Sequence, residues 1–590
     1  MFPLHDPLTD VLRAELSHYD DLTAALLARR GVVTKEAAEK FLNPSYDLHL
    51  HDPFLMTDMQ KAAERFARAI LNGEKIAVWS DYDCDGIPGA VLLHDFLKKA
   101  GANFENYIPH RHEEGYGMNI AGIEKLAKNG VQLIVTVDSG ITDVEPIKRA
   151  NELGMEVIVT DHHLPQEILP PAFAILNPNA RPEETYPFKS LCGSGVAWKL
   201  MCATLDVLRN PSPTSPRLRR ATEQIPLGWE KWLLDMVGLA TVADMVPLMD
   251  ENRLLVTYGL LVMRKSPRIG LQKLLRGMRV EQRQLTEDDI GFMIAPRVNA
   301  ASRMGEARDA FQLFITTDES EADLLTKKLE KLNRERKAQA GAITRAVHAR
   351  LKERGEMRDI IALGDPEWRP SLLGLVANTI AEEYERPVFL WGREGNNSLK
   401  GSFRSGGFTQ IMELIRATEK TFAQFGGHAA AGGFTVLDTE VFFLEDRLNK
   451  SYAELAPLEE GDSLMGRADA VLTPEEATLS YLTKVEKLAP FGMSNEKPVF
   501  LLRDVSIREI SRFGKSEEHL KLKIDSHLPA QAGDGKKSVD AVTFFVKGPI
   551  ARVANSLTRG TLVNLLAHLE RDTFSRSSPV RLRLLDIRLV

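Results

Sequence analysis

The chain has 590 residues, of which 75 are Lys or Arg and 82 are Asp or Glu, so its formal net charge is −7. Hydrophobic residues make up 44% of the sequence and no low-complexity bias occurs, which excludes a single small module, a collagen and an extensively disordered chain. Three cysteines without a zinc-type spacing, the lack of any apolar run of about 18 residues and a charged start at 1–10 predict a cytoplasmic protein without a membrane span or an export signal.

Residues 1–70 predict an N-terminal helical cap, because Met59, Ala62, Phe66 and Ile70 recur at helical spacing. Strands and helices then alternate. The strands are expected at 75–80, 131–137 and 155–160, and the helices at 87–100, 120–129 and 144–153. Short connections between such elements favour a parallel sheet that is covered on both faces. We therefore expect an α/β domain over residues 71–310.

Helical patterns continue at 194–208 and 229–263, with a proline-rich insertion at 209–216 between them. Residues 311–355 predict a connecting segment, in which 319–354 contain no proline and form one long helix. The charge run of this helix fits a solvated face better than a stripe that contacts nucleic acid. The second interpretation stays open.

The last two regions differ in pattern and in charge. Strands at 359–362, 387–391 and 432–437, with a helix at 372–384, predict a second α/β domain over 356–460. Residues 461–590 alternate in short segments and predict a small β-barrel. This barrel carries 20 Lys and Arg against 16 Asp and Glu, a net charge of +4, while the first 460 residues carry −11. The basic end could hold a polyanion.

Acidic or imidazole side chains follow three of the predicted strands. These groups are Asp81, Asp83 and Asp85 after the first strand, Asp138 after the second, and residues 161–163 (Asp-His-His) after the third. Because the carboxyl ends of parallel strands meet at one edge of a sheet, the side chains are expected to converge in one crevice.

Clustered carboxylates repel one another, so a divalent cation is expected to neutralise them. Carboxylate and imidazole donors without a thiolate cage suit Mn²⁺ or Mg²⁺, and we expect two ions. Plainer alternatives remain for each motif. Asp138 could cap a helix, the histidine pair could be ordinary polar surface, and the aspartate loop could be a surface turn. Cys84 has no obvious base partner and is not expected to act as a nucleophile.

The ordered motifs resemble those of the DHH phosphoesterase superfamily, and most closely those of its bacterial single-stranded-DNA exonucleases. The resemblance rests on residues 80–86, 136–140, 161–163, 240–244, 297–303, 401–405, 426–432 and 488–492. It implies a parallel-sheet DHH catalytic domain, a DHH-associated α/β domain and a C-terminal OB-fold barrel, and it spans nearly the whole chain.

The resemblance also implies roles for individual residues. The implied ligands of two Mn²⁺ or Mg²⁺ ions are Asp83, Asp85, Asp138, His162 and Asp244. Asp138 would bridge the ions, Asp81 would orient a ligand or a water, and His163 would face the substrate phosphate. The implied substrate-binding residues are Asn299, Arg303, Ser402, Arg404 and His428.

Two glycine-rich stretches, 401–405 and 426–427, are expected to offer flexible backbone to a phosphate, although ordinary turns are the alternative. Arg369, Ser371 and Ser302 stand where the family pattern predicts His, Gly and Gly, which affects the phosphate-holding half. On the barrel, the candidate groove residues are Arg508, Arg512, Phe513, Lys515, Lys521 and Lys523.

The expected function is that of a monomeric 5′-to-3′ single-stranded-DNA exonuclease in DNA repair and recombination, which releases mononucleotides. Single-strand-binding protein and a helicase are expected partners, and no membrane is expected. One alternative is a phosphodiesterase for short oligoribonucleotides or cyclic dinucleotides. A catalytically inactive DNA-binding scaffold is another.

Overall fold

A computed structural model describes residues 2–210, 225–394, 398–408, 410–427, 430–455, 467–514, 517–526, 538–546, 548–572 and 579–590. Most of the predicted insertion at 209–216 lies outside these ranges. The chain divides into two compact units, one formed by Met1–Leu50, Pro247–Leu254 and Glu459–Val590, the other by His51–Val246 and Leu255–Leu458. Among the described helices, none combines the length and the apolar character needed to cross a lipid bilayer.

The larger unit begins with a five-stranded sheet in the order β2-β1-β3-β4-β5. All neighbours in it are parallel, as predicted. The strands are β1 (Ile76–Ser80), β2 (Phe104–Tyr107), β3 (Leu133–Val137), β4 (Glu156–Thr160) and β5 (Ala174–Leu176). Every residue of β1 and β3 is buried, because helices cover both faces of the sheet.

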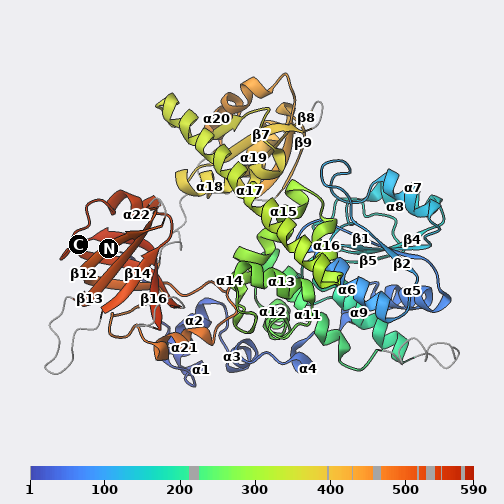
Figure 1. Cartoon of the computed structure of the whole chain (residues 1–590), viewed down its shortest axis with the longest axis horizontal. Coiled ribbons are helices and arrows are strands. Elements are labelled where there is room, and N and C mark those ends of the chain that lie inside the picture. The colour runs from blue at the N-terminus through green and yellow to red at the C-terminus, as the bar shows by residue number, and fades with distance from the viewer. Residues whose placement is uncertain are drawn as a thin grey trace. The chain divides into compact units, whose positions relative to one another are not determined.

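Two groups of helices provide this cover (Figure 1). One face carries α7 (Ile120–Lys128) and α8 (Val144–Glu152), while α5 (Met59–Asn72), α6 (Gly86–Lys99) and α9 (Gly193–Arg209) lie on the other. Apolar residues such as Trp79, Ile134 and Val157 pack beneath the first pair of helices. The fold of this region is therefore α/β, as expected.

A helical region follows the sheet and ends in the long helix. Its elements are η2 (Trp229–Leu233), α11 (Leu234–Ala243), α12 (Asp250–Met263), α13 (Ile269–Met278), η3 (Gln282–Gln284), α14 (Glu287–Asp289), η4 (Ile290–Ile294), α15 (Ala295–Met304), α16 (Arg308–Ile315) and α17 (Glu319–Arg354).

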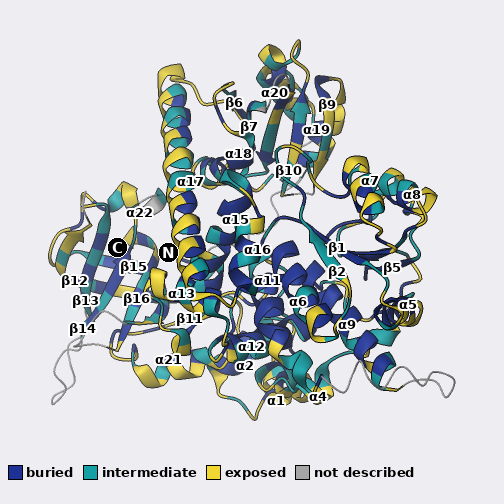
Figure 2. Ribbon diagram, turned by 45° about the vertical axis from the view of Figure 1, so that its right-hand side comes forward, coloured by how far each residue is buried: buried dark blue, intermediate teal, exposed yellow. Residues whose placement is uncertain are grey.

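The predicted bounds of the long helix α17 are confirmed. Asp318 caps its first turn, and Gly355 ends it with a left-handed φ of 73°. Its first half contacts α13, α15 and α16, and its second half contacts α18. Buried and exposed residues alternate along its length (Figure 2). The helix thus joins the two α/β regions of this unit.

The second sheet has the order β6-β7-β8-β10-β9. Its strands are β6 (Ile361–Gly364), β7 (Val388–Glu394), β8 (Ser398–Arg404), β9 (Phe422–Gly427) and β10 (Ala431–Val436). β6 and β7 are parallel, and the other pairs are antiparallel. The accompanying helices are α18 (Pro370–Tyr384), α19 (Ile411–Ala417) and α20 (Leu444–Glu454).

The glycine-rich stretches of this sheet are not the flexible loops that the sequence suggested. Gly401 lies in β8, and Gly426 and Gly427 lie in β9. A Cβ on Gly401 would come within 2.2 Å of the Phe434 ring, and one on Gly432 within 2.3 Å of the Phe403 ring. These two glycines therefore make room for aromatic rings inside the sheet.

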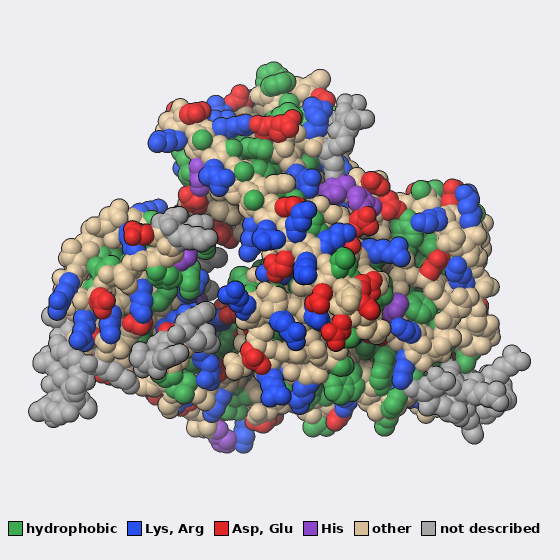
Figure 3. All heavy atoms as spheres, in the orientation of Figure 1, with side chains coloured by type: hydrophobic (Ala, Val, Ile, Leu, Met, Phe, Trp, Pro, Cys, Tyr) green, Lys and Arg blue, Asp and Glu red, His purple; other side chains and the backbone are tan. Residues whose placement is uncertain are grey.

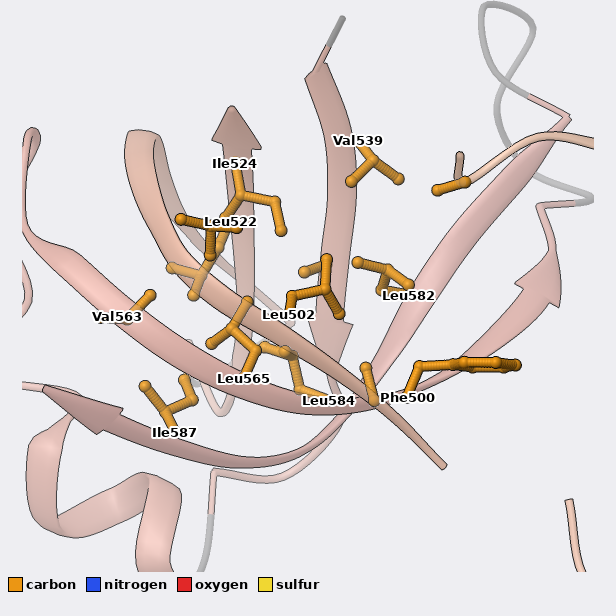
Figure 4. Close-up of a cluster of buried hydrophobic side chains, with 14 of the residues drawn as sticks. Phe500, Leu502, Leu522, Ile524, Val539, Val563, Leu565, Leu582, Leu584 and Ile587 are labelled. Carbon is orange, nitrogen blue, oxygen red and sulfur yellow. The ribbon is translucent and has the colours of Figure 1, made fainter. Parts of the chain in front are cut away.

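The smaller unit contains the predicted barrel. It is built from β11 (Ala470–Val471), β12 (Phe500–Phe513), β13 (His519–Ser526), β14 (Ser538–Thr543), β15 (Leu562–Arg571) and β16 (Val580–Leu589). The sheet order is β11-β12-β13-β14-β16-β15, and β12 also pairs with β15, which closes the barrel. Apolar side chains such as Leu502, Leu522 and Leu582 fill its interior (Figure 4).

The first 50 residues belong to this same unit. Their helices are α1 (Asp10–Glu15), α2 (Asp21–Arg29), α3 (Lys35–Leu42) and α4 (Tyr46–His49). Arg29 forms an ion pair of 2.8 Å with Asp469, and the buried Arg253 guanidinium donates to the carbonyl oxygens of Phe41 and Leu488. The N-terminal helices and the barrel are therefore tied to each other by polar contacts at several points.

Candidate active site

The three polar loops converge at the carboxyl ends of β1, β3 and β4, as predicted. The chain runs from β1 to β2 on one side of the sheet, whereas β3, β4 and β5 follow on the other side. The crevice between β1 and β3 is thus the point at which the strand order reverses. Open α/β sheets bind ligands at such a point.

The loop after β1 is shaped by hydrogen bonds to its own carboxylates. Asp83 Oδ1 accepts from the N–H groups of Asp85 and Gly86, at 2.7 and 3.1 Å. Asp85 accepts from the N–H groups of Gly193 and Ser194 at the start of α9, at 2.6 and 2.8 Å. A helix N-terminus stabilises a carboxylate in this position. The backbone therefore fixes both aspartates.

Asp138 follows β3 in a left-handed conformation, with a φ of 57°. Its side chain lies against Gly193, where an added Cβ would come within 2.5 Å of the Asp138 Cβ. Only glycine fits this position. The start of α9 therefore packs directly beneath Asp85 and Asp138.

His162 brings the aspartates together. Its Nε2 lies 3.2 Å from Asp138 Oδ1, 3.6 Å from Asp244 Oδ2 and 3.8 Å from Asp85 Oδ2. Asp244 reaches the site from the C-terminal end of α11. The structure thus gathers the five predicted ligands from four separate segments.

Three overlapping groups of side chains have ligand atoms within 4.8 Å of one another. These groups are Asp81, Asp83 and Asp138; Asp85, His162 and Asp244; and Asp138, His162 and His163. Asp138 and His162 each belong to two of them, and of the two only a carboxylate has two oxygens with which it could contact two ions. Asp81 and His163, expected to support the site from outside the ligand set, also lie within ligand distance.

Several polar atoms of the site are buried without a hydrogen-bond partner among the described residues. They are Asp81 Oδ1, Asp138 Oδ1, His162 Nε2 and Asp244 Oδ2. Burial raises the pKa of Asp138 well above its ordinary value, and the charges of Asp85 and Asp83 raise it further. Burial likewise raises the pKa of Asp81 and Asp244 and lowers that of His162. Divalent cations would satisfy these oxygen and nitrogen donors, so the residues fit Mn²⁺ or Mg²⁺.

Asp161 organises the histidine pair, a role that the sequence did not assign to it. Its buried carboxylate accepts from the N–H groups of Ile141, His162 and His163, and it lies 2.7 Å from His163 Nδ1. Burial lowers the pKa of His163, but the hydrogen bond and the charge of Asp161 outweigh burial and raise it to about 9. Asp161 therefore favours the protonated form of His163.

Two of the predicted substrate-binding residues lie beside the metal loop. Asn299 Oδ1 accepts from the Cys84 N–H at 2.9 Å. The Arg303 guanidinium donates to the Ser371 carbonyl at 2.8 Å, and Ser371 Oγ donates back to the Arg303 carbonyl at 3.1 Å. Ser371, which departs from the expected Gly, thus holds Arg303 in place.

Ser402 and Arg404 approach the first turn of α18. A Cβ on Gly374 would lie 3.1 Å from Arg404 Nη2 and 3.5 Å from Ser402 Oγ, so the two side chains meet at this glycine. Arg404 Nη1 donates to the Phe403 carbonyl, and burial lowers its pKa. Arg369 Nη1 lies 3.5 Å from Met304 Sδ, and Ser302 is buried in α15. His428 lies outside the described residues.

The loop between β2 and α7 supplies two more residues that the sequence interpretation missed. The Arg111 guanidinium stacks over the Tyr82 ring at 4.7 Å from its centre. The Tyr116 hydroxyl lies 3.3 Å from both the Asp138 carbonyl oxygen and His163 Nδ1. The sequence offered one signal for these residues, a loop after β2 that contains His110, Arg111 and His112.

On the barrel, the candidate groove residues occupy β12 and β13. Lys521 pairs with Asp540 at 2.8 Å, and Arg508 lies 3.8 Å from Asp525. Phe513 is 37% exposed and packs edge-on against the Phe544 ring. Lys515 lies outside the described residues. The remaining candidates, Arg512 and Lys523, lie on the same two strands.

Comparisons with known families follow this division of the chain. Residues 75–241 match the DHH family, N-terminal domain; residues 356–451 match the DHHA1 domain; and residues 468–586 match the RecJ OB domain. The order of the three matches is that of the first sheet, the second sheet and the barrel.

Several proteins that are similar to this chain share one name. The single-stranded-DNA-specific exonuclease RecJ of Bacillus subtilis is 35% identical over 86% of this chain, and that of Escherichia coli is 32% identical over 80%. The chain covers 62% of the first relative's length and 81% of the second's. A crystal structure of Thermus thermophilus RecJ in complex with Mn²⁺ has 27% identity and a TM-score of 0.78, covering all of this chain and 79% of that one.

Proposed function

The chain belongs to the RecJ family, and from this premise we propose that it is a metal-dependent exonuclease that hydrolyses single-stranded DNA from the 5′ end to 5′-mononucleotides. The observation that carries the proposal is the convergence of Asp83, Asp85, Asp138, His162 and Asp244 on one crevice. The relatives that carry this name support the choice of substrate.

The five converging residues would hold two Mn²⁺ or Mg²⁺ ions, with Asp138 between them. Two such ions lower the pKa of a shared water and stabilise the attacking and leaving oxygens of an in-line displacement at phosphorus. The N–H groups of Gly193 and Ser194 keep Asp85 oriented before the ions arrive. Asp81, buried beside Asp83, would orient a ligand or a bound water.

The cationic residues would hold the phosphate that is attacked. His163 keeps its proton near neutral pH because of Asp161, so its ring can donate to a phosphate oxygen. Arg303, Ser402 and Arg404 provide guanidinium and hydroxyl donors, and Asn299 keeps the Cys84 backbone in place. Such charge-assisted contacts orient the scissile bond. His428 is proposed to join this set.

The barrel would bind the strand through its basic side chains and its exposed Phe513. Because it has this barrel, the chain suits a polymeric substrate better than the substrates of the alternative phosphodiesterase, which are short oligoribonucleotides or cyclic dinucleotides. The second alternative, an inactive scaffold, would be expected to lack metal carboxylates, and all of them are present here.

We further propose that the enzyme acts in DNA repair and recombination in a bacterial cytoplasm, as a monomer with single-strand-binding protein and a helicase as partners. The division into a helical cap (1–70), a catalytic domain (71–310), a connecting helix (311–355), a DHH-associated domain (356–460) and an OB-fold (461–590) also stays a prediction.

A digestion with two labels tests the function. Single-stranded DNA labelled at its 5′ or its 3′ end is incubated with Mn²⁺, Mg²⁺ or EDTA, beside matched duplex and RNA. We expect metal-dependent release of a 5′-labelled mononucleotide from single strands alone. Preference for short RNA or cyclic dinucleotides would favour the first alternative, and binding without cleavage under either metal would favour the scaffold.

A further inference from the structure

The face of α17 that packs against α15 carries a group of cations next to Arg303. Arg336 and Lys337 lie on this face, one turn after the buried Asn333. The Arg336 guanidinium donates to Asn333 Oδ1 from both Nε and Nη2, at 3.2 and 2.9 Å. The neutral amide oxygen of Asn333 therefore orients the Arg336 guanidinium without neutralising its charge.

The positive charges of this group are poorly compensated. Within the described ranges, no ion pair is formed by Arg303, Arg336 or Lys337. The nearby Arg297, in contrast, forms an ion pair with Glu330. Burial lowers the pKa of Arg336, as does the charge of Arg297. Burial and the charges of Arg297 and Arg336 lower the pKa of Lys337, and the charge of Glu330 only partly opposes this shift. Like charges held this close destabilise one another unless an anion joins them.

The group continues directly from the proposed catalytic site. Burial lowers the pKa of Arg303 to about 10, and the charges of Arg111 and Arg336 lower it further, while Asp83 and Tyr82 oppose the shift. Arg303 is thus electrically coupled to the metal loop on one side and to Arg336 on the other. Figure 3 shows several Lys and Arg side chains on the face that α17 crosses.

We propose that Arg336 and Lys337 form a second phosphate-binding site, which holds a phosphodiester of the substrate strand beyond the one that is cleaved. This inference rests on the proposed function and deepens it. The ligand class is the backbone of a single-stranded nucleic acid, because a chain of cations that starts at the metal loop matches successive phosphates. One face of α17 would thus contact nucleic acid, and the rest would be solvated.

The helix itself supplies a matched control. Lys331 precedes Arg336 and Lys337 by five and six positions, so it points away from both of them on the helix. It is exposed, and its ion pair with Glu335 is long, at 3.9 Å. Lys331→Gln removes one positive charge from the same helix without touching the proposed site.

The test measures binding of a long single-stranded oligodeoxynucleotide and of a dinucleotide to the full chain, with hydrolysis blocked by EDTA. We expect Arg336→Gln/Lys337→Gln to weaken binding of the long strand by about tenfold or more. The log–log salt slope should become shallower by about 1.4, since each lost contact removes about 0.7 for single strands. The dinucleotide should lose much less affinity, and Lys331→Gln should change neither value.

Equal losses for both ligands, an unchanged salt slope, or the same effect from Lys331→Gln would overturn the proposal. If the double variant fails to fold, Lys337→Gln alone serves, because Lys337 is exposed, and its expected change in slope is about 0.7. Failure of the proposed function is distinct, since the unmodified chain would then neither bind nor cleave single-stranded DNA.

Discussion

The carboxyl edge of the first sheet gathers acids, whereas the first turn of α18 is flanked by arginines. Burial raises the pKa of Asp138 and Asp244 on the first side and lowers that of Arg303 and Arg404 on the second. Each side is therefore destabilised by its own charge. The acidic side needs cations and the basic side needs an anion, and a phosphate with its metal ions satisfies both.

The two sides also differ in what holds them. Backbone N–H groups of Gly86, Gly193 and Ser194 fix the carboxylates, so these side chains keep their positions before any ligand binds. Backbone carbonyls of Ser371 and Phe403 hold Arg303 and Arg404, and each accepts one hydrogen bond. Changes on the acidic side should therefore reduce turnover, and changes on the basic side should reduce affinity.

The largest effect is expected from Asp138→Asn. The amide keeps the shape and tolerates the left-handed φ, but it removes the charge between the two proposed ions. Turnover should fall at least about a thousandfold, while the circular dichroism spectrum and strand binding are retained. Glu145→Gln, the same chemical change at an exposed position on α8, should leave turnover intact. Near-normal turnover of a folded Asp138→Asn variant would refute the metal assignment.

Gly193→Ala tests whether the close packing beneath the acids matters. The added Cβ would meet Asp138 at 2.5 Å, so the metal loop must shift. A displacement of about 1 Å at a catalytic group costs about 10²-fold in rate. Gly195→Ala is the control, because its Cβ would make ordinary contacts at 3.6 Å and beyond. Steady-state kinetics that give equal rates for both variants would contradict this account.

Arg404→Gln should mainly raise KM on the basic side. A charge-assisted phosphate contact is worth about 1.5–3 kcal/mol, so KM should rise about tenfold to hundredfold with a smaller change in kcat. Arg393→Gln is a suitable control on the neighbouring strand, since Arg393 makes only a long ion pair of 4.0 Å with Asp438 in the described chain. A fall in kcat alone would place Arg404 in the chemical step.

The smallest effect is one of stability. Asp81, Asp138 and Asp244 have folded-state pKa values above their unfolded values, so the unfolded chain ionises first as the pH rises. Without metal, their contribution is complete below about pH 4 and is lost as the pH rises through the folded-state pKa values. In EDTA, Tm should therefore fall as the pH rises above about 4, by about 1 °C for each kcal/mol lost in a unit of this size.

The same scan in Mn²⁺ is the control. The ions hold the carboxylates ionised, so the fall in Tm should shrink and the difference between Mn²⁺ and EDTA should grow with pH. Differential scanning calorimetry measures both values. A Tm that rises with pH in EDTA would mean that these carboxylates are not strained by burial.

Local sequence signals predicted much of this architecture. The bounds of α17 are set by Asp318 and Gly355, and the strands of the first sheet are set by runs of apolar residues, all of them short-range features. Residues 401–405 were misinterpreted, because ring packing by Phe434 is a tertiary contact that leaves only a glycine in the sequence.

The sequence by itself determined which candidate acids meet at the edge of the first sheet, since an acid that follows a buried parallel strand must lie at that shared edge, whereas Asp244 reaches the site from the end of a helix. Only the tertiary structure decided that Asp161 raises the pKa of His163, that Gly193 packs against Asp138 and that Ser371 holds Arg303. These pairs are 2, 55 and 68 residues apart, respectively. The last two pairs depend on distances between elements, and the effect of Asp161 on His163 depends on burial, which no local pattern encodes.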